Sequence, residues 1–203
     1  MATEIELKAH VHDSEALKAL LHEKAEYSSA FEKDDTYWLL APGFPVPPDS
    51  RLRVRREQRN RLDGSSVSAT VVTYKTKEKR DGMEVNDELE FDVNPGPEFE
   101  VFLKRMGCTP GISKRKRGWD FSRGEITAEL VEIEGLGWFI EMEILAAEAA
   151  REGGSFSDSS DNMDKVVAEA REKLLGFLDE LGISRDDIES QYYTEMLSRH
   201  VTS

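Results

Sequence analysis

The sequence has few of the residues that build disulfide frameworks and zinc centres, and it has no long hydrophobic run. One cysteine, Cys108, stands among 203 residues with only four histidines, so an internal disulfide framework and a cysteine-rich zinc site are both excluded. No apolar run approaches the roughly 20 residues that cross a bilayer, and the first residues lack the basic and apolar regions of a signal peptide. We therefore expect a cytoplasmic protein with no membrane partner.

Basic residues are also in the minority. The chain has 27 Lys and Arg against 41 Asp and Glu, a formal net charge of −14, which argues against a general nucleic-acid binder. Hydrophobic residues make up 38% of the chain, too large a share for global disorder. The length suits one domain, and we expect residues 1–203 to form a single domain with 182–203 as an integral tail.

Charged residues recur at every second position in several strand-like runs. In residues 3–11, Glu6 and Lys8 alternate with Ile5 and Leu7, which is typical of a β-strand with one apolar and one charged face. Like charges on one strand repel, and acidic strands facing basic strands across a common wet cavity would relieve that repulsion. The acidic faces carry Glu4, Glu6, Glu84, Glu88, Glu90, Glu141 and Glu143, and the basic faces carry Arg51, Arg53, Arg55, Lys75 and Lys77.

Eight segments are candidates for strands and four are candidates for helices. We expect strands at 3–11, 35–40, 51–57, 68–77, 84–92, 112–121, 125–134 and 138–144, and helices at 13–25, 97–106, 162–181 and 186–198. Eight antiparallel strands suffice to close a barrel around a lumen. The predicted fold is therefore α+β: a closed eight-stranded antiparallel β-barrel, a tunnel with a charged lumen, whose outward apolar faces are covered by helices. Trp38, Trp119 and Trp138 are expected to pack in this outer layer.

Several short motifs follow one another in a familiar order. The first is Glu4-Ile5-Glu6-Leu7-Lys8, an ExExK pattern. The others are Asp35-Thr36-Tyr37, Leu52-Arg53-Val54-Arg55, Thr73-Tyr74-Lys75, Glu88 with Glu90, Lys114 with Lys116, the segment 135–143, and the tail Leu181-Gly182-Ile183 followed by 193–197. Together they resemble the CYTH superfamily, also called the triphosphate tunnel metalloenzymes, and are nearest to its class IV adenylyl cyclase-like branch.

The sequence departs from that family pattern at four places. Asn86 stands where a basic residue is usual, and Tyr192 stands where the tail has a serine. The aspartate that precedes the Gly-Leu-Gly segment falls on Val131, and Glu129 replaces it if two residues are inserted, because an even insertion keeps the same strand face. In segment 112–121 two registers are open: either Lys114 and Lys116 or the neighbouring Arg115 and Arg117 face the lumen.

The resemblance implies a site in which basic side chains and metal ions hold a triphosphate. Arg offers phosphate a planar fork and Lys a point charge, while carboxylates suit Mg²⁺ or Mn²⁺. The implied substrate-binding residues are Lys8, Arg53, Arg55, Lys75, Lys77, Lys114 and Lys116. The implied metal ligands are Glu4, Glu6, Glu141 and Glu143, supported by Glu88, Glu90 and Glu129. Lys8, Glu4 and Glu6 are the implied catalytic residues. For Lys8 a phosphate-binding role is favoured over a role as base, because the adjacent glutamates keep it protonated.

Three functions use this apparatus. A triphosphatase releases the terminal phosphate of tripolyphosphate or of a nucleoside or organic triphosphate, whereas a class IV-type adenylyl cyclase converts ATP to cyclic AMP and pyrophosphate. A non-catalytic polyphosphate- or nucleotide-binding protein would use the same residues. Hydrolysis needs only water as the nucleophile and no adenine pocket, so triphosphatase activity is the favoured prediction. The expected partner is a small molecule containing a triphosphate, not a nucleic acid, and the expected state is a monomer or homodimer.

Overall fold

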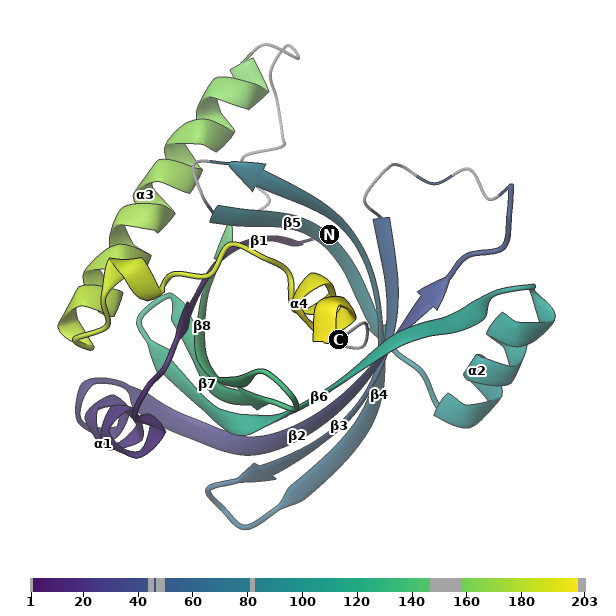
Figure 1. Ribbon diagram of the computed structural model, residues 1–203, viewed down its shortest axis with the longest axis horizontal. Helices are drawn as coiled ribbons and strands as arrows, with labels where there is room; N and C mark the ends of the chain where they lie inside the picture. Colours follow the sequence, from purple (N-terminus) through teal and green to yellow (C-terminus); the bar gives the residue numbers. More distant parts are fainter. Residues whose placement is uncertain (1, 44–45, 47–49, 81–82, 147–157, 201–203) are drawn as a thin grey trace.

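Eight antiparallel strands close into a single barrel (Figure 1). The computed structural model describes residues 2–43, 46, 50–80, 83–146 and 158–200. Around the barrel the strands follow one another in the order β1-β5-β4-β3-β2-β6-β7-β8, with β8 beside β1. They are β1 (Ala2–His10), β2 (Glu26–Leu39), β3 (Ser50–Arg61), β4 (Ser66–Arg80), β5 (Met83–Asp92), β6 (Thr109–Arg123), β7 (Ile126–Ile133) and β8 (Gly137–Ala146). The predicted fold class is confirmed.

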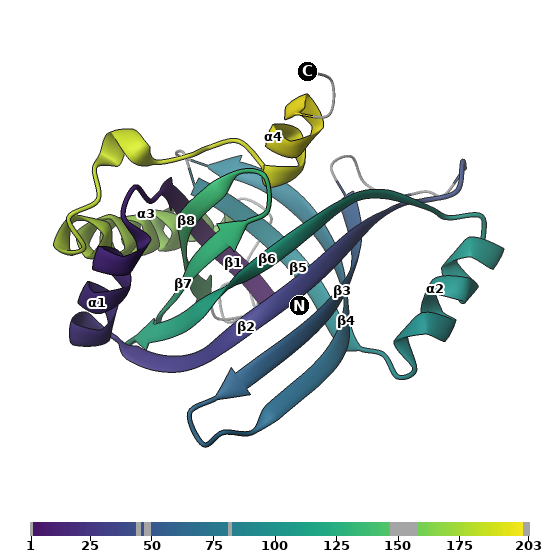
Figure 2. The same ribbon diagram turned by 60° about the horizontal axis from the view of Figure 1, so that its bottom comes forward.

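Two helices cover the outward apolar faces on one side of the barrel, as Figure 2 shows. They are α1 (Ser14–Lys24) and α3 (Asp158–Glu180). Asp13 caps α1 by accepting a 3.0 Å hydrogen bond from the backbone N–H of Ala16, which satisfies one of the unpaired donors of the first turn. The core between helices and strands includes Leu21, Leu174 and Leu178, all fully buried, with Ile5 and Ile140 of β1 and β8.

A smaller core lies on the opposite side, beneath α2 (Gly96–Arg105). Trp38 is buried there against Val54, Val72 and Leu103. The other two tryptophans, Trp119 and Trp138, stack with their ring centroids 5.6 Å apart and pack against the larger core. The three tryptophans thus pack in the outer layer, as their position on the apolar strand faces predicts.

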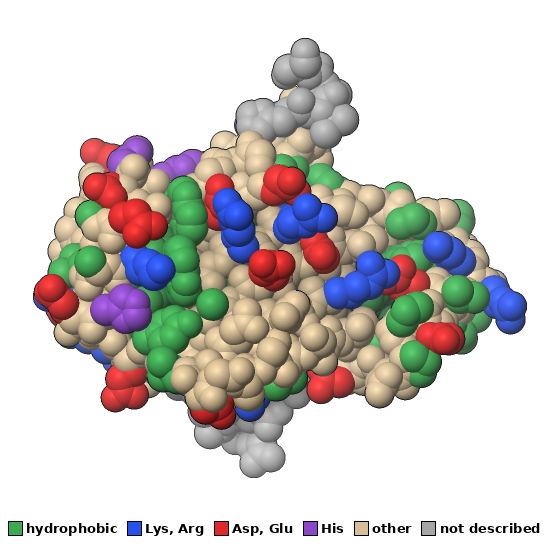
Figure 3. Space-filling view, turned by 90° about the horizontal axis from the view of Figure 1, so that it is seen from below, with side chains coloured by type: hydrophobic (Ala, Val, Ile, Leu, Met, Phe, Trp, Pro, Cys, Tyr) green, Lys and Arg blue, Asp and Glu red, His purple; other side chains and the backbone are tan. Residues whose placement is uncertain are grey.

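The outer surface carries charges of both signs. Figure 3 shows acidic and basic side chains interspersed over the face below the barrel, with hydrophobic side chains gathered toward α1 at one end and α2 at the other. Among the latter, Val101, Phe102 and Met106 are exposed. Of the described helices, none is long and apolar enough to cross a bilayer.

The structure corrects the predicted bounds of two segments. The strand expected at 35–40 begins at Glu26, because the run 32–35 places charges on both faces and so hides the alternation. The single helix expected at 186–198 is instead the short 3₁₀ turn η2 (Arg185–Asp187) followed by the helix α4 (Tyr193–His200). Between them Ile188 bridges to Ala9 and the Glu189 N–H donates to the Lys8 carbonyl at 2.9 Å, so this segment is extended.

The close approach of β6 to β7 leaves no room for a side chain at Gly118. A Cβ on Gly118 would lie 2.1 Å from the carbonyl oxygen of Leu130, which is backbone in the neighbouring strand and has little room to move. We expect Gly118→Ala to lower the free energy of unfolding by about 1–3 kcal/mol through overpacking, measured by urea denaturation.

Gly176 in α3 is the matched control. A Cβ there meets nothing within 4 Å, and alanine is the better helix former, so Gly176→Ala should raise the free energy of unfolding by about 0.5–1 kcal/mol. Equal effects of the two substitutions would contradict the close-approach explanation.

Candidate active site

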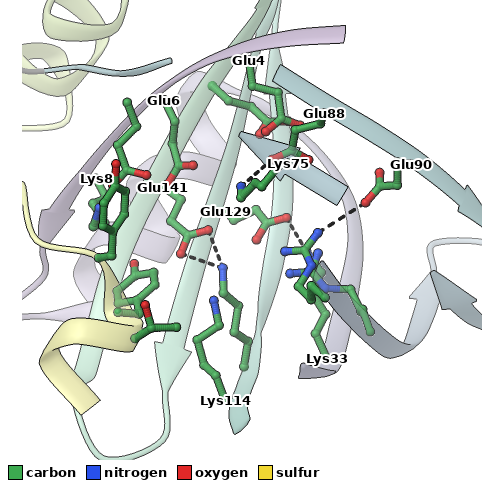
Figure 4. Close-up of a pocket in the computed structure, with 18 of the residues that line it drawn as sticks. Glu4, Glu6, Lys8, Lys33, Lys75, Glu88, Glu90, Lys114, Glu129 and Glu141 are labelled. Atoms are coloured by element: carbon green, nitrogen blue, oxygen red, sulfur yellow. Dashed lines mark hydrogen bonds and ion pairs between the residues drawn. The ribbon is translucent and has the colours of Figure 1, made fainter. Parts of the chain in front are cut away.

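The lumen encloses a highly charged cavity of about 190 Å³ to which all eight strands contribute side chains. Its described lining contains eight acidic and eight basic residues and no aliphatic side chain. The acidic residues are Glu4, Glu6, Glu84, Glu88, Glu90, Glu129, Glu141 and Glu143, and the basic ones are Lys8, Lys33, Arg53, Arg55, Arg59, Lys75, Lys114 and Lys116. Tyr37, Thr127, Tyr192, Tyr193 and Thr194 complete the lining. The strand alternation therefore places a charge-balanced set of groups inside the barrel (Figure 4).

An acidic wall is formed where the first and last strands meet. Glu6 of β1 lies directly opposite Glu143 of β8 and Glu84 of β5. Burial, Glu88 and Glu143 raise the pKa of Glu4 to about 9, and burial together with Glu84 and Glu141 raises the pKa of Glu6. Burial, Glu129 and Glu6 raise the pKa of Glu143 to about 8. These carboxyl groups lack sufficient positive charge nearby, so Glu4 and Glu143 favour their protonated forms at neutral pH and the pKa of Glu6 shifts in the same direction.

A basic wall lies across the cavity, organised around one carboxylate. Asp35 of β2 has a fully buried side chain and accepts two hydrogen bonds from Arg55, at 2.7 and 3.0 Å. Its other carboxylate contacts are Arg53 at 3.9 Å and Lys114 at 3.4 Å. Burial opposes ionisation, but Arg55, Arg53 and Lys114 hold the pKa of Asp35 well below its usual value. One anion thus orients three cations that point toward the lumen.

Ion pairs connect the two walls. Lys8 pairs with Glu84, and Lys75 with Glu88. The Nζ of Lys116 lies 2.7 and 2.6 Å from the two carboxylate oxygens of Glu141. The remaining links are Lys33 with Glu129 and Arg53 with Glu90, the latter at 3.3 Å. In this arrangement the basic groups occupy the positions that cations would otherwise take between the acids.

The register of β6, left open by the sequence, has Lys114 and Lys116 facing the lumen. Both are buried, whereas Arg115 and Arg117 point outward and pair with Asp34 and Glu132. Glu129 also lines the cavity. The side chain of Lys77 lies outside the described residues; its backbone pairs with Asn86 on β5. Every other residue implied by the resemblance is brought to this one cavity.

Lys8 is held in its charged form. Burial acts to lower its pKa, but Glu6 and Glu84 outweigh this and raise it. Glu141 is held ionised in the same way, because Lys116 and Lys114 lower its pKa despite its burial. Lys8 is protonated and paired with Glu84, and Glu141 is paired with Lys116, so neither is an unpaired base in the structure.

Several cavity residues were given no role by the sequence. They are Lys33, Tyr37, Arg59, Glu84 and Tyr193, together with the buried Asp35 behind the basic wall. Lys33 and Tyr37 lie two residues before and after Asp35, so all three side chains point to the same face of β2. The sequence could predict this only if the full length of β2 were known. Burial acts to raise the pKa of Tyr37, but the positive charge of Lys114 outweighs burial and lowers this pKa to about 8.

Part of the lumen is apolar and lies under the C-terminal helix. Phe31, Val131, Ile133 and Phe139 are buried there with Tyr193, the first residue of α4. Figure 1 shows α4 within the opening of the barrel ring. The tail is therefore in contact with the lumen.

The donor chemistry of the acidic wall fits a divalent cation. As the side chains are placed, no group of three Asp, Glu, His or Cys among the described residues is arranged to hold a metal ion. The raised pKa values of Glu4 and Glu143 nonetheless identify carboxyl groups whose ionised forms need added positive charge. Carboxylate oxygens without Cys or His partners are the ligand type of Mg²⁺ or Mn²⁺.

The buried Asp35 cluster yields a stability prediction. Asp35→Asn removes a buried negative charge that contacts three cations of the basic wall, and breaking such buried pairs costs about 3–5 kcal/mol. Because the folded pKa of Asp35 is depressed, its contribution is present above its ordinary value of 3.8 and is lost as pH falls through the folded pKa. Urea denaturation should therefore show a constant deficit from pH 5 to 8 that narrows only in strong acid.

Asp34→Asn is the control on the same strand. Asp34 pairs with Arg115 at 2.8 Å on the exposed outer face, where ion pairs contribute little. A deficit as large for Asp34→Asn as for Asp35→Asn would contradict the organising role of the buried carboxylate.

Solved structures share this fold. The PH1819 protein of Pyrococcus horikoshii OT3 is similar with a TM-score of 0.77 and 25% identity, covering 97% of this chain and 99% of that chain. The Putative adenylyl cyclase HpAC1 of Hippeastrum has a TM-score of 0.62 and 18% identity, covering 94% and 91% of the two chains. That structure is described as revealing a dominant triphosphatase activity of the Hippeastrum protein.

Sequence comparison agrees with the fold. The Putative adenylate cyclase MJ0240 of Methanocaldococcus jannaschii is 28% identical over 148 residues, which cover 73% of this chain and 71% of that protein. The model of the CYTH domain matches residues 2–193, nearly the full length. The charged tunnel, its strand order and this match lead to one conclusion. The chain belongs to the CYTH domain family.

Proposed function

We propose that this protein is a metal-dependent triphosphatase that hydrolyses the terminal phosphate of tripolyphosphate or of a nucleoside or organic triphosphate. The observation that carries the proposal is the balance of eight acidic and eight basic side chains in one cavity. A triphosphate brings several negative charges, and divalent cations bring matching positive charges. Bound together, the triphosphate and the cations neutralise each other's charge, and each meets side chains of the opposite sign in the cavity.

The basic wall binds and orients the phosphates. Arg55 donates two hydrogen bonds to Asp35, and Arg53 donates to Thr73 and Glu90. A planar guanidinium can make two parallel bonds to phosphate oxygens. Lys75 and Lys116 add point charges when phosphate oxygens compete with Glu88 and Glu141 for them. Because the groups are fixed before substrate arrives, little reorganisation opposes binding.

The acidic wall holds Mg²⁺ or Mn²⁺. Glu4, Glu6, Glu141 and Glu143 are the proposed ligands, with Glu88, Glu90 and Glu129 nearby. A bound divalent cation supplies charge neutralisation of phosphate oxygens and orientation of the attacking oxygen. Glu4 and Glu6 would bind the metal ion in their ionised forms, so their raised pKa values without metal fit ligands that added positive charge would ionise. Lys8 stays protonated and donates to substrate or Glu84.

Hydrolysis is favoured over cyclisation by the lining of the cavity. The described residues that line the cavity are charged or hydroxyl-bearing, and none is aliphatic, which suits phosphate better than an apolar organic group. The apolar side chains of the lumen are buried against one another and against Tyr193. Water is the only nucleophile that hydrolysis needs. Adenylyl cyclase activity is the second candidate, favoured by the 28% identical relative named for that activity.

Removal of two proposed ligands tests the metal assignment. Glu4→Gln with Glu6→Gln should abolish metal-dependent phosphate release, because amides bind divalent cations more weakly than carboxylates. Mn²⁺ affinity, followed by the loss of its free electron paramagnetic signal on binding, should fall by at least about tenfold. The circular dichroism spectrum should stay that of the wild type.

The matched control removes two exposed acids from helices, Glu23→Gln with Glu172→Gln, and should retain both Mn²⁺ binding and turnover. Wild-type turnover in the Glu4/Glu6 variant would overturn the ligand assignment.

Product analysis decides the reaction. With Mg²⁺ or Mn²⁺, the protein is incubated with tripolyphosphate, ATP, GTP or thiamine triphosphate, and products are separated by ion-exchange chromatography. Orthophosphate with the corresponding diphosphate is the expected result. Cyclic AMP with pyrophosphate identifies the cyclase instead, and binding without any product identifies a non-catalytic polyphosphate-binding protein.

A further inference from the structure

The C-terminal tail is fixed against the strand that carries Lys8. Ile188 bridges to Ala9, and the Glu189 N–H donates to the Lys8 carbonyl at 2.9 Å. The start of α4 is capped at Tyr192, whose N–H donates to the Glu195 carboxylate at 3.3 Å; a glutamate at this position commonly fixes a helix start. Tyr193, the first residue of α4, is thereby held at one place over the lumen.

The ring of Tyr193 lies among three lysines of the basic set. Its centroid is 5.5 Å from the Nζ of Lys8, 5.0 Å from that of Lys114 and 5.4 Å from that of Lys116. The ring is 7% exposed and packs edge-to-face on Phe139, with centroids 5.0 Å apart. These lysines come from two strands, β1 and β6, so one tail residue connects groups that the barrel alone keeps separate.

Three ammonium groups around one point repel each other, and burial together with Lys116 lowers the pKa of Lys114. The face of an aromatic ring attracts a cation within about 6 Å, most strongly where water is excluded. Unlike a carboxylate, the ring does so without neutralising the ammonium charge. Burial and Glu141 raise the pKa of the Tyr193 phenol well above its usual value, so the ring stays neutral.

We propose that Tyr193 positions Lys8, Lys114 and Lys116 for binding the triphosphate, so that the C-terminal tail is part of the substrate site. This inference rests on the proposed function and deepens it. Tyr193 acts through the lysines as a positioning residue. Without the ring, nothing at this place attracts the three ammonium groups together against their mutual repulsion, and less positive charge converges on the phosphates.

Two substitutions at this position distinguish the effect of the aromatic ring from that of the hydroxyl and from that of apolar packing. Tyr193→Phe keeps the ring, whereas Tyr193→Leu keeps an apolar side chain but removes the π face. Titration calorimetry with tripolyphosphate and Mg²⁺ should show a dissociation constant at least about tenfold higher for Tyr193→Leu and within about threefold of wild type for Tyr193→Phe. In turnover assays Tyr193→Leu should raise KM more than it lowers kcat.

Met196→Ala is the control for loosening of the tail. Met196 packs in the same apolar cluster as Tyr193 and Phe139, so its truncation should lower the melting temperature and leave tripolyphosphate affinity unchanged. Wild-type affinity in Tyr193→Leu, equal loss in Tyr193→Phe, or equal loss in Met196→Ala would each overturn the inference. Absence of tripolyphosphate binding by the wild type would overturn the proposed function as well, whereas binding without hydrolysis would overturn only the triphosphatase assignment.

Discussion

The burial of Asp35 among three cations is the interaction on which the site depends. A carboxylate removed from water is stable only with compensating charge, and Arg55, Arg53 and Lys114 provide it. The same requirement holds elsewhere in the lumen, where Lys8, Lys75 and Lys116 each pair with a glutamate. A closed barrel makes this possible because strands distant in sequence, such as β1 and β8, become neighbours. The resulting cavity is lined by acidic and basic side chains before any ligand enters.

The alternation that fills the lumen with charge also determines the outer architecture. Since alternate residues of each strand face opposite ways, inward charges leave apolar side chains such as Ile5 and Ile140 facing outward. The helices α1 and α3 bury that surface, and α2 buries a second patch around Trp38. The hydrophobic core therefore lies outside the barrel and the polar site lies inside it. Stability and site chemistry occupy opposite faces of the same strands.

The C-terminal tail joins these two layers. It leaves the end of α3, pairs with the end of β1 and places Tyr193 in the apolar part of the lumen beside Phe139. From there the ring contacts lysines of two strands. The barrel strands carry the charged side chains, and we propose that the tail helps to position three of the lysines. The proposed triphosphatase site thus includes residues from both ends of the chain.

The sequence by itself determined the parity of most strands. Alternation in Glu4-Ile5-Glu6-Leu7-Lys8 and in four other segments identifies an inward charged face, because side-chain direction depends on position along a strand. With eight candidate strands in all, the sequence predicts a closed barrel with charged residues inside. Alternation fails where both faces are charged. It therefore missed the first half of β2 with Lys33, and it left Lys114 and Arg115 as equal choices in β6.

Only the tertiary structure decided which charges meet. The pairing of Lys8 with Glu84, the three cations around Asp35 and the ring of Tyr193 over the lysines all join residues far apart along the chain. No local pattern encodes these contacts, since they arise from strand order, register and closure. The sequence determined the kinds of groups in the tunnel, and closure of the barrel determined their partners, because opposite charges can compensate each other only once the strands share one lumen.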